Sequence, residues 1–126
     1  MSYVDTGIRT ALKEARKSDC PSYRIGAALM KCNQMVSKGR SIFKKSHTKS
    51  RTIFNGIHAE FNCLHGVDPD KYRSCTLFVA RVTPSGTISM ARPCEGCLEL
   101  LRECGIRVFY YTDYNGNVVR EAISGR

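Results

Sequence analysis

The sequence of 126 residues has no apolar run long enough to span a membrane. Its first seventeen residues carry charges throughout and do not form an apolar signal segment. Internal repeats, low-complexity tracts and linker-like changes of composition are also missing. Hydrophobic residues make up 42% and charged residues 25%, which is typical of a soluble globular protein. We therefore expect a single cytoplasmic domain over residues 1–126, with no membrane partner.

Acidic residues are scarce, with 11 Asp and Glu against 20 Lys and Arg, and the formal net charge is +9. The stretch "KGRSIFKKSHTKSR" (residues 38–51) contains no acid at all. Residues 38–55, which include this stretch, lack a clear hydrophobic period, so we expect a loop there. Its Lys44 and Lys45 are candidates for contacting a nucleotide 5′-phosphate or a nucleic-acid backbone, and the alternative is a solvated basic loop.

Seven cysteines are present, and an odd number cannot all pair within one chain. Without a secretion signal, free thiols or metal ligands are favoured over a disulfide scaffold. Five of the cysteines are expected to be small buried residues. They are Cys20, Cys32, Cys63, Cys75 and Cys104.

The hydrophobic pattern predicts helices and strands in alternation. Helices are expected over 2–19, 58–66 and 94–105, a hairpin around "KCNQ" (31–34), and strands over 75–83 and 106–112. A turn at Asn115-Gly116 leads into a last short strand. This order predicts an α/β fold with three layers, α/β/α, around a central mixed sheet of about five strands.

The motif "PCEGC" places Cys94 and Cys97 where both can face one zinc ion. If a helix begins near Cys94, the free N–H groups of its first turn and its dipole favour thiolate over thiol. Pro93 then lies just before the helix, where its missing N–H costs nothing. By itself this motif also fits half of a structural zinc site or a redox pair.

The motif "IHAEF" supplies one further ligand, His58. Along a helix His65 lies about 10 Å from His58, and Cys63 points about 140° away, so neither can join the same ion. An open fourth position is typical of catalytic zinc, where water binds. Glu60 is two residues past His58 and can reach the open side of the ion. A buried carboxylate there suits proton transfer and has no structural use.

The paired "HAE" and "PCEGC", separated by residues 61–92, match the H-x-E and P-C-x-x-C signature of zinc nucleobase deaminases. Over about residues 24–112, including "LELLRECGIRVFYYT", the chain resembles the cytidine/deoxycytidylate deaminase superfamily, and especially its small phage and bacterial members. The resemblance implies one Zn²⁺ per chain, held by His58, Cys94 and Cys97, with water or hydroxide as fourth ligand and Glu60 as the proton shuttle.

The implied reaction is hydrolytic deamination of cytosine at C4, or of adenine at C6, with release of ammonia. A free (deoxy)cytidine nucleotide such as dCMP is the expected substrate. By resemblance, the backbone N–H of Ala59 contacts the base, and Pro93 is counted among the substrate-binding residues. Ser41 stands where relatives often carry the asparagine of G-x-N, and Asn55 is a candidate replacement. "KKSHTK" resembles a loop of small phage relatives and makes His47 a further candidate.

Two other functions remain open at this stage. A polynucleotide deaminase acting on a base in single-stranded DNA or RNA is favoured by the net charge and the basic stretch. A zinc-stabilised binding module without catalysis requires a fourth protein ligand and an idle Glu60. The expected partners are a nucleotide or nucleoside, single-stranded nucleic acid in the second case, and a second copy in a homo-oligomer.

Overall fold

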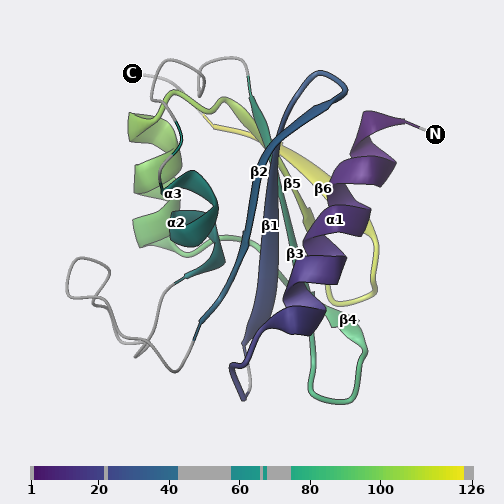
Figure 1. The fold of residues 1–126 in the computed structure, drawn as a ribbon. Coiled ribbons are helices and arrows are strands. Elements are labelled where there is room, and N and C mark those ends of the chain that lie inside the picture. Colours follow the sequence, from purple (N-terminus) through teal and green to yellow (C-terminus); the bar gives the residue numbers. More distant parts are fainter. Residues whose placement is uncertain (1, 22, 43–57, 66, 68–74, 124–126) are drawn as a thin grey trace.

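The computed structural model describes residues 2–21, 23–42, 58–65, 67 and 75–123 (Figure 1). In chain order the elements are α1 (Tyr3–Lys17), β1 (Arg24–Lys31), β2 (Gln34–Arg40), α2 (Ala59–Leu64), β3 (Thr76–Val82), β4 (Ile88–Ser89), α3 (Glu95–Glu103), β5 (Val108–Thr112) and β6 (Val118–Ala122). Within these residues no helix is both long and apolar enough to cross a membrane.

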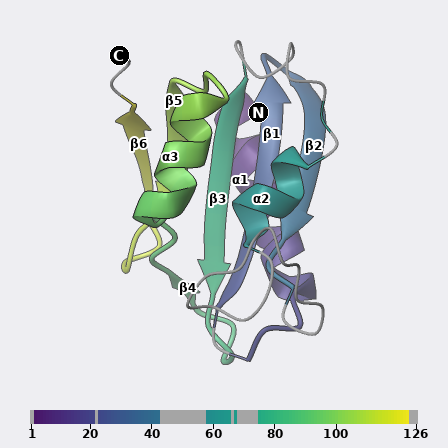
Figure 2. The same cartoon turned by 90° about the vertical axis from the view of Figure 1, so that its left-hand side faces the viewer.

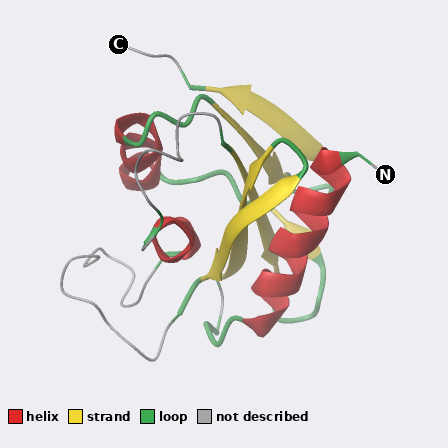
Figure 3. Cartoon of the chain, turned by 45° about the horizontal axis from the view of Figure 1, so that its top comes forward, coloured by secondary structure: helices red, strands yellow, loops and turns green. Residues whose placement is uncertain are grey.

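The strands form one mixed sheet in the order β2-β1-β3-β5-β6, with the short β4 paired to β3. Among the described strands only β3 and β5 pair in parallel, and α3 lies on the connection between them. Helix α1 covers one face of the sheet, and α2 and α3 cover the other (Figures 1 and 2). Figure 3 shows the same division, with the strands between the two groups of helices. The predicted three-layer α/β fold is confirmed.

The sheet has six strands among the described residues, one more than expected, because β4 was not predicted. This strand has two residues, Ile88 and Ser89, and pairs with the end of β3. A strand so short leaves no period in the sequence, so its pairing depends on the turn at Thr83–Thr87.

Strand β3 is buried on both faces, which explains its almost continuous apolar sequence. Leu77 and Val79 point into the cluster under α2 and α3, together with Phe109 of β5. Phe78 and Ala80 point into the cluster under α1. This alternation fixes the register of the central strand, because a shift by one residue would exchange the two faces.

Two local expectations were wrong. Residues 38–40 continue strand β2 and do not belong to a loop. Cys32 is exposed at the β1–β2 turn with a φ of 55°, so it is not a core residue. Cys20, Cys63 and Cys75 are buried as expected, and Cys104 is half-buried. Residues 43–51 of the basic stretch lie outside the described residues.

Candidate metal centre

The starts of two helices meet at one place and bring three donor atoms together. His58 is the N-cap residue of α2 and Cys94 is the N-cap residue of α3. Cys97 follows in the first turn of α3. The Nδ1 atom of His58 lies 3.3 Å from Sγ of Cys97 and 3.9 Å from Sγ of Cys94. The three donor atoms all lie within 4.8 Å of one another.

These spacings fit a zinc ion. Ligand atoms at Zn–S and Zn–N bond lengths of about 2.3 and 2.0 Å in a tetrahedron lie roughly 3.5–3.8 Å apart. Two sulfurs and one imidazole are also a donor set that zinc prefers. In the described part of the chain no fourth His, Cys, Asp or Glu joins this group. Cys63 and His65 are outside it, as the helical spacing predicts.

Helix α2 is held against the edge strand β2 by side-chain to backbone contacts. Ser37 Oγ donates to the carbonyl of Cys63 at 2.6 Å, and Asn62 Nδ2 donates to the carbonyl of Arg40 at 3.1 Å. Gly39 lies directly under this helix, where a Cβ atom would come within 2.6 Å of the backbone nitrogen of Cys63. The close approach therefore requires glycine, and it sets the height of α2, and so of His58 and Glu60, above the sheet.

The segment that leads to Cys94 is attached to a different part of the sheet. The Ala91 N–H donates to the carbonyl of Thr112 at 2.9 Å, and Thr112 Oγ1 donates to the carbonyl of Ser89 at 2.7 Å. Arg92 forms an ion pair with Glu121 of β6. The two halves of the metal cluster are thus anchored separately, one on β2 and the other on β5 and β6.

Glu60 lies in the first turn of α2 and is buried, with 3% of its surface exposed. Burial raises the pKa of its carboxyl, and a backbone hydrogen bond and a hydrogen bond with Cys97 partly offset that rise. A buried carboxyl with a raised pKa exchanges a proton closer to neutral pH than a solvated one. It lies outside the group of three donors although it contacts Cys97.

The electrostatics of the cluster favour a cation. Burial lowers the pKa of His58, so its imidazole is neutral, which is the form that binds metal. Burial raises the pKa of Cys97, and the nearby charges of Glu60 and Cys94 raise it further. A divalent cation between the sulfurs would offset this repulsion and stabilise both thiolates.

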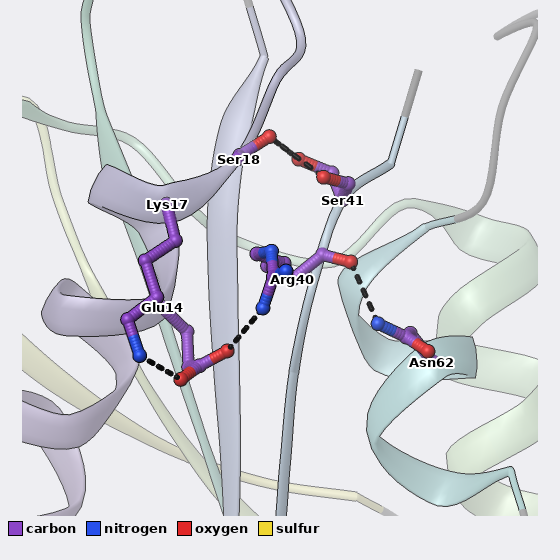
Figure 4. Close-up of polar contacts among 6 residues, drawn as sticks. All are labelled: Glu14, Lys17, Ser18, Arg40, Ser41 and Asn62. Atoms are coloured by element: carbon purple, nitrogen blue, oxygen red, sulfur yellow. Dashed lines mark hydrogen bonds and ion pairs between the residues drawn. The ribbon is translucent and has the colours of Figure 1, made fainter. Parts of the chain in front are cut away.

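Ser41 lies at the end of β2, in a polar network that joins α1 to β2 (Figure 4). Its hydroxyl donates to the carbonyl of Tyr23 at 2.6 Å, accepts from the Ile25 N–H at 3.1 Å and lies 2.8 Å from Ser18 Oγ. Only 2% of Ser41 is exposed. The single proton of Ser41 Oγ is used by the Tyr23 carbonyl, and Ser18 Oγ donates its own proton to the Ser41 carbonyl at 2.7 Å. The substrate contact of Ser41 stays a prediction.

The remaining predicted substrate-binding residues fall into two groups. Ala59 is the first residue of α2 and is buried, and its N–H belongs to a turn that has no intrahelical acceptors. Pro93 is buried immediately before Cys94. The others lie outside the described residues: Lys44, Lys45, His47 and Asn55.

Residues that position the cluster were missed by the sequence reasoning. Asn62 and Gly39 dock α2, and Arg92 and Glu121 tie the Cys94 segment to β6. Their partners are 22 to 29 residues away in the chain. Such long-range pairs leave no periodic signal in the sequence. The one local signal was the position of Arg92 two residues before the Cys-x-x-Cys motif.

Comparison with known proteins gives one family match and several structural matches. The sequence model of the "Cytidine and deoxycytidylate deaminase zinc-binding region" matches residues 1–113. No curated protein matches the chain by sequence. The apo crystal structure of dCMP deaminase from cyanophage S-TIM5 is similar with a TM-score of 0.64 and 19% identity, covering 88% of this chain and 82% of that one.

Two larger proteins share the fold over the same 88% of the chain. Acinetobacter baumannii RibD matches with a TM-score of 0.56 and 15% identity. A diaminohydroxyphosphoribosylaminopyrimidine deaminase/5-amino-6-(5-phosphoribosylamino)uracil reductase from Thermotoga maritima matches with a TM-score of 0.56 and 20% identity. The match covers 28% and 30% of those two chains. At these identities the likeness shows the fold alone.

Proposed function

Because the chain belongs to the cytidine and deoxycytidylate deaminase zinc-binding family, we propose that it hydrolytically deaminates the cytosine of a free (deoxy)cytidine nucleotide such as dCMP. The observation that carries this proposal is the meeting of His58, Cys94 and Cys97 beside the buried carboxyl of Glu60. The fold likeness to a cyanophage dCMP deaminase supports the choice of a nucleotide.

In this proposal His58, Cys94 and Cys97 hold one zinc ion. When bound, zinc supplies Lewis acidity that makes water nucleophilic at neutral pH. Glu60 takes one proton from the attacking water and passes it to ring nitrogen N3, and then carries the second proton from the new C4 hydroxyl to the amino nitrogen of the base. Oxygen becomes bonded to C4, the C4–N bond breaks, and ammonia leaves, so one water is consumed for each ammonia released. The first-turn N–H of Ala59 donates to the base.

A substitution at Glu60 tests this role. We expect Glu60→Gln to lower kcat by about 10²–10⁴-fold, the usual contribution of a general acid–base group. The zinc content should stay at that of the wild type, because glutamine keeps the shape and Glu60 is not among the three donors. Ammonia release from cytidine, deoxycytidine, dCMP and dCTP measures the activity and ranks the substrates. Wild-type turnover in the zinc-loaded variant would refute the role of Glu60.

A binding module without catalysis is the less favoured function. It needs a fourth protein ligand, and the described residues offer three donors. It also leaves Glu60 buried with no role, although burying a carboxylate is costly. A zinc-loaded protein that releases no ammonia from any of the substrates above would favour it.

A polynucleotide substrate is the second candidate, favoured by a row of exposed cations on α1. Arg9, Lys13 and Lys17 follow at intervals of four residues, and Lys38 is exposed on the edge strand β2. Like charges four residues apart destabilise an isolated helix, and a bound phosphate backbone would offset this repulsion. Helix α1 lies on the face of the sheet opposite α2 and α3 (Figure 1). A nucleic acid that contacts both α1 and the metal centre would therefore have to pass around the edge of the sheet at β2.

The salt dependence of binding separates these two substrates. For a single-stranded oligonucleotide the slope of log K against log salt is about −0.7 for each phosphate neutralised. Replacing Arg9, Lys13 and Lys38 by glutamine should therefore reduce the slope by about 2 in magnitude. An unchanged slope, or no uracil in the oligonucleotide after incubation with the enzyme, would contradict a polynucleotide substrate and leave the free nucleotide.

A further inference from the structure

The segment between β4 and α3 has no regular secondary structure, yet it carries the first cysteine of the metal cluster. Arg92 lies two residues before Cys94. Its Nε donates to Glu121 Oε1 at 2.9 Å and its Nη2 donates to Glu121 Oε2 at 2.7 Å. Two parallel hydrogen bonds from one guanidinium define the orientation as well as the distance of the pair.

Glu121 provides a rigid attachment point for this segment. It is the last residue but one of β6, where it pairs with Phe109 of β5. A hydrogen bond from Tyr111 also reaches its carboxylate. A side chain held by strand pairing and by a neighbouring tyrosine moves less than one on a free loop. The guanidinium of Arg92 is therefore fixed relative to the sheet.

The two cysteines depend differently on this attachment. Cys97 is 7% exposed and is held by the packing of α3 against the core. Cys94 is exposed, so packing alone does not fix its sulfur. In the described part of the chain the segment before it is held by the Ala91 backbone bond, by the bond from Thr112 Oγ1 to the Ser89 carbonyl and by the Arg92–Glu121 pair. The carbonyl of Cys94 accepts from the Leu98 N–H at 2.8 Å, which holds its backbone but not its side chain. The position of Cys94 Sγ thus depends on the ion pair more than that of Cys97 Sγ does.

We propose that the Arg92–Glu121 ion pair is a positioning device that holds Cys94 in the geometry required for metal binding. This inference rests on the proposed zinc site. Contacts beyond the ligands commonly orient them and raise metal affinity. The alternative is an ordinary exposed ion pair, since 44% of the Arg92 side chain and 32% of that of Glu121 are exposed. Such pairs change global stability little.

The chain contains a matched control for this alternative. Arg102 and Glu99 form another exposed ion pair, also at 2.7 Å, on the side of α3 away from its start. Arg92→Ala and Arg102→Ala remove the same group from two exposed pairs. Zinc affinity is measured for both by competition with a chromogenic chelator, and melting of the metal-free proteins is followed in parallel.

We expect Arg92→Ala to weaken zinc binding about fivefold, the upper range for an exposed bidentate pair. Arg102→Ala should leave zinc affinity unchanged, and both metal-free variants should melt close to the wild type. The thiolate-to-metal absorption of the Co²⁺-substituted protein should change in Arg92→Ala alone. The reversed pair, Arg92→Glu with Glu121→Arg, should restore most of the affinity, which a purely local packing role of Arg92 would not do.

The outcomes distinguish the positioning role of the Arg92–Glu121 pair from the proposed deaminase function. A wild-type chain that binds zinc, with the same affinity in Arg92→Ala, would overturn the positioning role alone. Equal losses in Arg92→Ala and Arg102→Ala, or no recovery in the reversed pair, would overturn it as well. A wild-type chain that binds no zinc would overturn the proposed function, and the positioning role with it. A tightly bound zinc with no deaminase activity would refute the reaction and leave the affinity test of Arg92 valid.

Discussion

Replacing Gly39 by alanine should move helix α2 slightly away from strand β2. An alanine Cβ at this position would lie 2.6 Å from the nitrogen of Cys63 and 2.9 Å from the carbonyl carbon of Asn62. Ordinary contact begins at 3.4 Å, so α2 must retreat by about 0.8 Å, the difference between 3.4 and 2.6 Å. The atoms that clash belong to the backbone, so no side chain can rotate to relieve the contact.

Two consequences follow from that displacement. Overpacking of this kind costs about 1–3 kcal/mol of stability. For a domain of this size the melting temperature should then fall by roughly 3–12 °C. Metal ligands tolerate errors of only about 0.2 Å, so a shift of α2 that moves His58 should also weaken zinc binding.

Gly96→Ala provides the control in α3. A Cβ atom at Gly96 meets nothing within 4 Å, and glycine inside a helix costs about 0.5–1 kcal/mol relative to alanine. This variant should therefore melt slightly above the wild type. Thermal unfolding with and without zinc, together with chelator competition, measures both effects. If Gly39→Ala melts with the wild type and binds zinc equally well, α2 is not fixed by this close approach.

Three further results are expected. In metal-free protein a thiol reagent should modify the exposed Cys32 and Cys94 first, and added zinc should protect Cys94 but not Cys32. Peptide mass spectrometry measures this order, and early labelling of the buried Cys20 would contradict the fold. Burial raises the pKa of Cys63 to about 12, from an ordinary value of 9.0. The folded protein therefore holds the thiol proton more tightly than the unfolded chain does, which stabilises the folded state. That contribution is complete below about pH 9 and is lost as the pH rises toward 12, so urea unfolding across this range should show a steeper loss of stability in the wild type than in Cys63→Ala. Leu101→Ala should cost about 2–5 kcal/mol in urea unfolding, because the Leu101 side chain of α3 is fully buried in the core cluster between this helix and the sheet. A loss below about 1 kcal/mol would argue against that packing.

The parts of the centre that could be predicted are those that depend on one helical turn. The spacing of Cys94 and Cys97 and the expected helix start agree with the observed N-cap at Cys94. The exclusion of Cys63 and His65 followed from helical geometry, and neither lies in the group of three donors found among the described residues. These inferences succeed because 3.6 residues per turn fix which side chains lie together, whatever the rest of the chain does.

The layers of the fold were also predictable, and the limits of that prediction have a clear cause. Apolar runs alternating with amphipathic segments predicted helices on both faces of a mixed sheet. Strand β4 was not predicted because a strand of two residues is too short to show a hydrophobic period. Cys32 was misplaced because a small apolar side chain is usually buried, whereas the tight turn between β1 and β2 brings it to the surface.

The sequence by itself was enough to name the candidate residues of the centre, since His58, Glu60, Cys94 and Cys97 are identified by residue type and local spacing, and their roles stay predictions. Only the tertiary structure decided how those groups are held. The fit of Gly39 under α2 and the pairing of Arg92 with Glu121 depend on strand order and register, which bring together residues far apart in the chain. Local spacing is set by backbone geometry within a turn, whereas contacts between distant segments arise only when the whole sheet is assembled.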